Sequence, residues 1–121
     1  MNAPTEPSWL RPMLIKWTPQ AIRVLMQLVE AGLARGECSP NDITDRNYPE
    51  PNVVGAVFKA LPKFGFQQAD RRINSVHASQ HGRKVFVWEC VDSMQAQRLL
   101  LDMKCAMLGE RQPENGQLIM L

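Results

Sequence analysis

The sequence predicts an α+β fold, on the strength of three observations. Apolar residues recur at helical spacing in two stretches of the first half of the chain and again after Ser93. Between them, Lys84–Val91 alternates in the manner of a β-strand. With 121 residues, 45% of them hydrophobic, the chain is long enough for one domain with a real core and too short for two.

The first predicted helix begins after Thr18, a plausible N-cap, with Pro19 at the first helical position, where proline is favoured. Either Gly32 or Gly36 ends it. The three prolines and few periodic positions before Trp17 predict an N-terminal arm over residues 1–17. The apolar positions of the helix are Ile22, Leu25, Met26, Val29 and Leu33.

The next segment predicts a short extended link, a short helix and a turn. The link is Glu37-Cys38. Ser39 then begins a short helix, with Asp42 three residues later in the place of a capping box. Pro49 and Pro51 force a turn before the next helix.

A second clear helix is predicted over residues 51–61, with Pro62 ending or kinking it and Gly65 as its stop. Its residues divide between two faces. The predicted buried stripe is Val54, Val57, Phe58, Leu61 and Phe64, and the opposite side carries Asn52, Gly55, Ala56, Lys59 and Lys63.

A long β-hairpin and a third helix complete the predicted elements. The strands are Phe66 to about Ile73 and Lys84–Val91, joined by a polar connection rich in turn formers. In the second strand, Phe86, Trp88 and Cys90 alternate with Val85, Val87, Glu89 and Val91. A helix over residues 92–108 follows, capped by Asp92 or Ser93 and stopped by Gly109, and residues 109–121 form a tail.

The positive charge of the chain is concentrated in one third of it. Residues 59–91 carry six lysines and arginines against two acidic residues, whereas the net charge of the whole chain is only +2. A local basic patch of this kind favours a polyanionic partner, with a solvated surface that contacts no partner as the alternative.

The order of these elements resembles that of winged helix-turn-helix proteins. GECSPNDITDRNYPEPNVVGAVFKALPKFGF resembles their helix-turn-helix, and RRINSVHASQHGRKVFVWE resembles their wing, so the resemblance covers roughly residues 18–91. A weaker resemblance joins the chain to small winged-helix proteins of bacteriophages and mobile elements. The resemblance implies a three-helix core with a hairpin wing, here followed by an additional C-terminal helix, and a function in binding duplex DNA as a transcriptional regulator or a replication or recombination accessory.

The resemblance also implies which residues meet the DNA. The helix from Pro51 would be presented to a major groove, where Asn52 reads an adenine edge, lysines hold phosphates, and Gly55 and Ala56 allow close approach. The wing would lie over the flanking backbone or a minor groove. The implied DNA-binding residues are Asn52, Lys59, Lys63, Arg71, Arg72, Arg83 and Lys84. Because the presented helix is poor in arginine and glutamine, a dimer or a protein partner would supply the missing specificity.

Catalysis, metal binding and cofactors are not expected. His77 and His81 are four residues apart, a spacing that shares a face only on a helix, and this stretch reads as a hairpin loop. Paired carboxylates, a glycine-rich phosphate loop and a GxSxG elbow are absent from the sequence. Of the cysteines, Cys90 and Cys105 are expected to be buried and Cys38 to be the most exposed.

The last helix offers more apolar residues than one core needs, which favours a homodimer through Leu100, Met103 and Met107, although a helix that only closes the core is an equal alternative. The second hypothesis for the function is a protein-interaction module that docks on a host or replication protein. The odd number of cysteines and the lack of a secretory signal or a membrane-spanning run predict a cytoplasmic protein.

Overall fold

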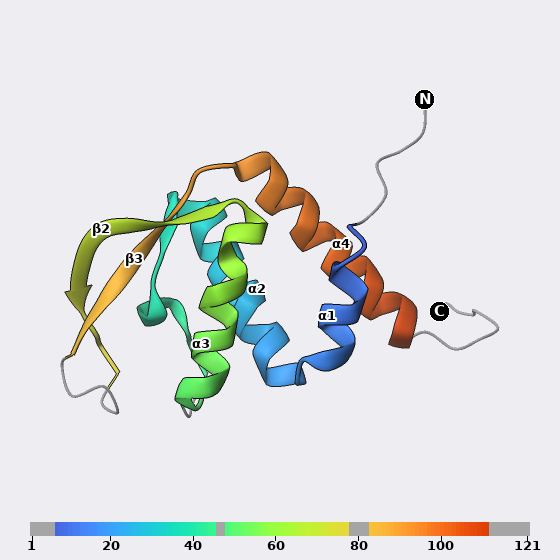
Figure 1. Cartoon of the computed structure of the whole chain (residues 1–121), viewed down its shortest axis with the longest axis horizontal. Helices are drawn as coiled ribbons and strands as arrows, with labels where there is room; N and C mark the ends of the chain where they lie inside the picture. Colours follow the sequence, from blue (N-terminus) through green and yellow to red (C-terminus); the bar gives the residue numbers. More distant parts are fainter. Residues whose placement is uncertain (1–6, 46–47, 78–82, 112–121) are drawn as a thin grey trace.

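The structure, a computed structural model, describes residues 7–45, 48–77 and 83–111. These residues form an α+β fold with four α-helices and a three-stranded antiparallel sheet in the order β1-β3-β2. The elements are α1 (Leu10–Lys16), α2 (Pro19–Arg35), β1 (Glu37–Cys38), the 3₁₀-helix η1 (Pro40–Asp42), α3 (Pro51–Ala60), the 3₁₀-helix η2 (Leu61–Phe64), β2 (Phe66–Asn74), β3 (Lys84–Cys90) and α4 (Ser93–Arg111). Figure 1 shows the β2–β3 hairpin at one side of the molecule, α1 and α4 at the other, and α2 and α3 between them.

Helix α2 is central to the core and contacts α3, α4, β1 and β3. The Thr18 hydroxyl accepts a hydrogen bond from the Ala21 N–H at 3.1 Å, which confirms the predicted N-cap. Gly36, with φ of 88°, ends the helix in the left-handed conformation. Gly32 instead lies buried within the helix, where an added Cβ would come within 2.2 Å of the Phe66 ring on β2.

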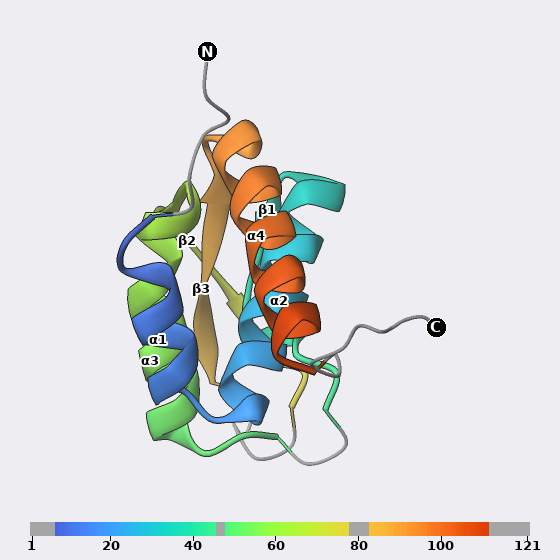
Figure 2. The same cartoon turned by 90° about the vertical axis from the view of Figure 1, so that its right-hand side faces the viewer.

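Helix α1 was not predicted, because an arm was expected over residues 1–17. Leu10 and Leu14, one helical turn apart, are buried in the core and anchor this helix. Pro12 does not prevent it, because the N–H groups of the first helical turn have no partner within the helix and proline loses nothing there. Figure 2, viewed from the side away from the hairpin, shows α1 and α4 in front.

The connection from α3 to the hairpin follows the predicted glycine stop. The regular helix ends at Ala60, and Pro62 lies within η2. Gly65 then turns the chain with φ of 86°. Its carbonyl accepts the N–H groups of Val91 at 2.8 Å and Asp92 at 3.1 Å, and these bonds tie the start of β2 to the end of β3.

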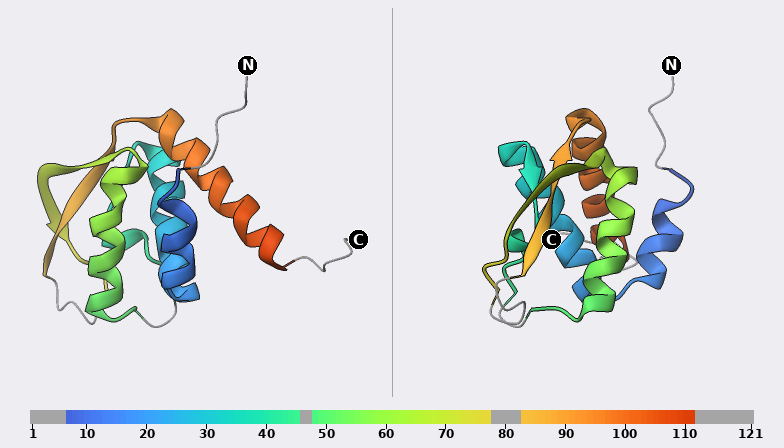
Figure 3. Two further views of the ribbon diagram at one scale, coloured as in Figure 1. Left: turned by 45° about the vertical axis from the view of Figure 1, so that its right-hand side comes forward. Right: turned by 60° about the vertical axis from the view of Figure 1, so that its left-hand side comes forward.

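Helix α4 begins where it was predicted and ends later. The Asp92 carboxylate accepts a hydrogen bond from the Gln95 N–H at 3.1 Å, so Asp92 is the residue that caps it. The helix continues to Arg111, two residues past Gly109, which was wrongly predicted to stop it. Glycine in a helix costs only about 1 kcal/mol relative to alanine, too little to end a helix unaided. Within the described part of the chain, no helix has the length and apolar character needed to cross a membrane. The left view of Figure 3 shows α4 extending away from the end of β3.

Candidate nucleic-acid interface

The two predicted faces of α3 and η2 are confirmed. Of the predicted stripe, Val57, Leu61 and Phe64 are buried and Val54 and Phe58 are half-buried. All five residues of the opposite side are exposed, namely Asn52, Gly55, Ala56, Lys59 and Lys63. The solvent-exposed surface of α3 and η2 therefore combines small side chains with the positive charges of two lysines.

One face of the hairpin turns toward α3. The Phe58 ring on α3 lies 5.7 Å from the Trp88 ring on β3. Lys84 and Phe86 precede Trp88 at intervals of two residues, the spacing that places strand residues on the same face. Arg72, the cross-strand partner of Phe86, places its guanidinium carbon 5.3 Å from the centroid of that ring. We call Arg72, Lys84, Phe86 and Trp88 the α3-side face of the hairpin.

Phe86 was not among the residues predicted for the site. Phe86 is 40% exposed, with the Arg72 guanidinium over its ring. That Phe86 shares a strand face with Trp88 could be predicted from the sequence, but the pairing of Phe86 with Arg72 depends on an irregularity in β2 between Gln68 and Arg72. The strand register, rather than the sequence pattern, thus brings Phe86 into this group.

Arg71 lies on the other face of the hairpin. Its guanidinium donates a hydrogen bond to the Glu37 carboxylate on β1 at 2.5 Å. Glu37 is paired in register with Glu89, a neighbour of Trp88 that points away from the α3-side face. The structure therefore separates Arg71 from Arg72, two residues that were predicted to act together.

Lys63 is also separated from the hairpin. Its ammonium lies 5.1 Å from the centroid of the Trp9 ring, next to α1, and its carbonyl accepts a hydrogen bond from the Gln95 amide at 2.6 Å. Arg83 is exposed just before β3, and its carbonyl accepts a hydrogen bond from the Ser75 N–H at 2.8 Å. Of the predicted cations, Arg72 and Lys84 share the α3-side face of the hairpin, and Lys59 is exposed on α3 itself.

Asn41 fastens the outer end of β2 to η1. Its side-chain amide donates to the Asn74 carbonyl at 3.0 Å, and its side-chain oxygen accepts the Val76 N–H at 2.9 Å. This amide satisfies one donor and one acceptor of the strand end at once. The hairpin is therefore held to η1 at its outer end as well as to Gly65 at its base.

His77 belongs to the same attachment. Its Nε2 lies 2.9 Å from the Pro40 carbonyl, and its ring centroid is 4.3 Å from that of Tyr48. His77 lies in the connection after β2, as predicted, but its side chain is half-buried and packs this end of the hairpin against the fold. His81 lies outside the described residues. Among the residues that the structure describes, no group of three or more histidine, cysteine, aspartate or glutamate side chains could hold a metal ion.

Two of the predictions about cysteines were wrong. Cys38, expected to be the most exposed, is 1% exposed because β1 pairs with β3 and turns it into the core. Burial, with a smaller contribution from the Asp42 carboxylate, raises the pKa of Cys38 to about 12. Cys105, expected to be buried, is exposed, and Cys90 is half-buried. The buried Cys38 thiol is unsuited to nucleophilic chemistry at neutral pH.

The apolar residues of α4 that were predicted to form a dimer interface face the core of the chain itself. Leu100 and Met103 are buried, and Met107 packs against the core. The exposed apolar residues of this helix include Met94, 79% exposed, and Leu101, 61% exposed. Leu100 and Met103 are therefore not accessible to a partner, whereas Met94 and Leu101 are.

Comparisons with known proteins assign the chain to no group: no family model matches it, and no curated protein or solved structure is significantly similar to it.

Proposed function

We propose that the protein is a winged-helix protein that binds duplex DNA, with the β2–β3 hairpin as its wing. The arrangement that supports the proposal is the placement of Arg72, Lys84 and Phe86 on the hairpin face from which Trp88 contacts Phe58 of α3. The exposed side of that helix carries Lys59. The sheet order β1-β3-β2, with α2, η1 and α3 preceding the hairpin, is compatible with a winged-helix layout. A transcriptional regulator, or a replication or recombination accessory of phage or bacterial origin, is the class of protein that this implies.

Each part of the surface has a role in the proposal. Gly55 and Ala56 carry no long side chain, so α3 can come close to the floor of a major groove. Asn52 supplies an amide for a base edge, and Lys59 reaches a phosphate. Arg72 and Lys84 on the wing hold the flanking backbone, which contributes affinity without sequence information.

The test is binding of the full chain to a fluorescently labelled duplex of mixed sequence, measured by anisotropy over a series of salt concentrations. We expect the affinity to fall steeply with salt. If three phosphates are contacted, a plot of the logarithm of the association constant against the logarithm of the salt concentration should have a slope of roughly −3. Lack of binding at low salt, to both random and selected duplexes, would overturn the proposal.

A second candidate function is docking on another protein, which includes a second copy of this chain, through α4. It is favoured by the exposure of Met94 and Leu101, two large apolar side chains seven residues apart on one side of the helix. Sedimentation of the native protein and of Leu101→Asp tests the homodimer. A dimer that the substitution dissociates, in a chain that stays folded, supports this function, and a monomer at all accessible concentrations removes its homodimeric form.

A further inference from the structure

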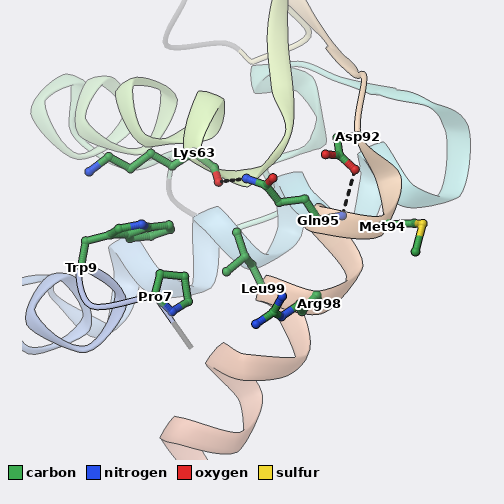
Figure 4. Close-up of a pocket in the computed structure, with 8 residues that line it drawn as sticks. All are labelled: Pro7, Trp9, Lys63, Asp92, Met94, Gln95, Arg98 and Leu99. Carbon is green, nitrogen blue, oxygen red and sulfur yellow. Dashed lines mark hydrogen bonds between the residues drawn. The ribbon is translucent and has the colours of Figure 1, made fainter. Parts of the chain in front are cut away.

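An open cavity of about 700 Å³ lies where α1, η2 and the start of α4 meet (Figure 4). Its apolar walls include Trp9 and Pro7 on one side and Leu99 on the other. Cavities of roughly 300–1,000 Å³ with apolar walls and a few polar groups are typical of small-molecule sites. The cavity lies apart from the α3-side face of the wing, and none of the DNA contacts proposed above lines it. Lys63, which the resemblance to winged-helix proteins implied as a DNA contact, does line it.

The walls of this cavity are fixed by the core behind them. The Trp9 ring meets the fully buried Phe64 ring edge to face at a centroid distance of 5.6 Å. Leu99 is only 3% exposed and packs in the main core. The apolar surface is therefore already formed, so a ligand would not need to order it at an entropic cost.

The polar groups of the cavity are unequal in what they can offer a ligand. The Asp92 carboxylate accepts the Gln95 N–H at the start of α4, and the Gln95 amide donates to the Lys63 carbonyl. The Lys63 ammonium, in contrast, forms no ion pair with another described residue and lies over the Trp9 ring, as Figure 4 shows. A second cation, Arg98, lines the cavity from the next turn of α4.

We propose that this cavity binds a small organic anion with a flat apolar body, such as an aromatic carboxylate. The flat body would lie along the Trp9 ring, which is half-buried and held against Phe64, with the buried Leu99 side chain behind it. The carboxylate would pair with Lys63 at the rim, whose charge is not taken up by a described acidic residue. An uncharged ligand of the same shape would lose this pairing.

The test uses 2-naphthoate as the probe and the uncharged 2-naphthylmethanol as its matched comparison, with the full chain and no DNA. Two-dimensional amide NMR is expected to show shifts for Lys63, Gln95 and Leu99 on adding 2-naphthoate. Lys63→Gln should weaken 2-naphthoate about threefold to fivefold, the range of one exposed ion pair. Lys59→Gln, the same charge change one turn earlier on a residue that does not line the cavity, should leave the affinity unchanged.

The outcomes separate the proposal from simpler accounts. Equal binding of 2-naphthoate and 2-naphthylmethanol would show an apolar cavity without selection for an anion and would overturn the proposal. Equal weakening by Lys63→Gln and Lys59→Gln would show general charge attraction and would overturn it too, as would the absence of shifts around the cavity. Because no DNA is present, none of these results bears on the proposed DNA binding.

Discussion

Arg71 and Arg72 are adjacent in β2 and project to opposite faces of the hairpin. Arg71 donates a hydrogen bond to Glu37 on β1, and Arg72 lies over the Phe86 ring at 5.3 Å. Two arginines that read in the sequence as one basic pair thus form two different kinds of contact. Arg71 is partly neutralised by its partner, whereas the charge of Arg72 is available beside α3.

The first prediction compares these two arginines as matched variants. Arg72→Ala should reduce the slope of log affinity against log salt by about one, because one phosphate contact is lost. Arg71→Ala should change the slope less, since its charge is paired with Glu37 and it lies on the other face. Anisotropy with a labelled duplex over a salt series measures both. An equal effect of the two substitutions would contradict the assignment of the α3-side face to DNA.

The second prediction concerns Gly55, an exposed glycine in the middle of α3. A Cβ added there meets nothing within 4 Å, so a side chain can be introduced without disturbing the core. Gly55→Ala should stabilise the protein by about 0.5–1 kcal/mol, since alanine is the better helix former. Gly55→Glu should leave the fold intact and weaken DNA binding at least about tenfold, because it places a carboxylate and added bulk against the phosphates.

Urea denaturation and the same anisotropy assay measure the two quantities for Gly55. The alanine variant is the control for shape, as it adds a methyl group without charge. If Gly55→Glu bound DNA as well as the wild type while remaining folded, α3 would not be the surface that enters the groove, and the alternative of a protein-docking module would gain.

The third prediction follows from the burial of Cys38, which raises the pKa of its thiol from 9.0 to about 12. Because the native state holds this proton and the unfolded state releases it, the contribution of the neutral thiol to stability is fully present below pH 9 and is lost as the pH rises toward about 12. Titration of this one thiol lowers the free energy of unfolding by at most about 1.4 kcal/mol per pH unit.

Urea denaturation under reducing conditions, at a series of pH values, tests this linkage. Cys38→Ala should be less stable at neutral pH because a buried side chain is shortened, and its stability should decline less steeply between pH 9 and 12. Tyr48, whose pKa burial also raises, titrates in both proteins and so cancels in the comparison. Parallel pH curves for the two proteins would show that Cys38 does not cause the decline.

The order of the elements could be predicted because short-range signals define their ends. Thr18 with Pro19, the capping box of Ser39 with Asp42, and the left-handed Gly65 each act within a few residues and were all found in place. Such signals depend on local hydrogen bonds that any fold must satisfy, so the sequence alone is enough to read them.

The placement of side chains depended on contacts between distant segments, and here the sequence misled. The burial of Cys38 comes from its pairing with Trp88, which is fifty residues later in the sequence, and no local pattern encodes it. In the same way, Leu101 and Leu100 look alike in the sequence, and only the packing of α4 on α2 decides which is buried. The assignment of Arg72 to the α3-side face likewise required the irregular register of β2.

The last prediction concerns Gly32, which is buried in α2 against β2. A Cβ at this position would come within 2.2 Å of the Phe66 ring, and Phe66 is itself only 3% exposed, so the ring has little room to move. Although alanine is the better helix former, Gly32→Ala should therefore destabilise the protein by about 1–3 kcal/mol through overpacking. The same substitution at Gly55 has the opposite sign, because that site is open. Urea denaturation of both variants measures the contrast, and Gly32→Ala combined with Phe66→Leu should recover part of the loss, since the shorter side chain leaves room for the methyl group. A Gly32→Ala variant as stable as Gly55→Ala would show that β2 does not pack on α2 at this contact.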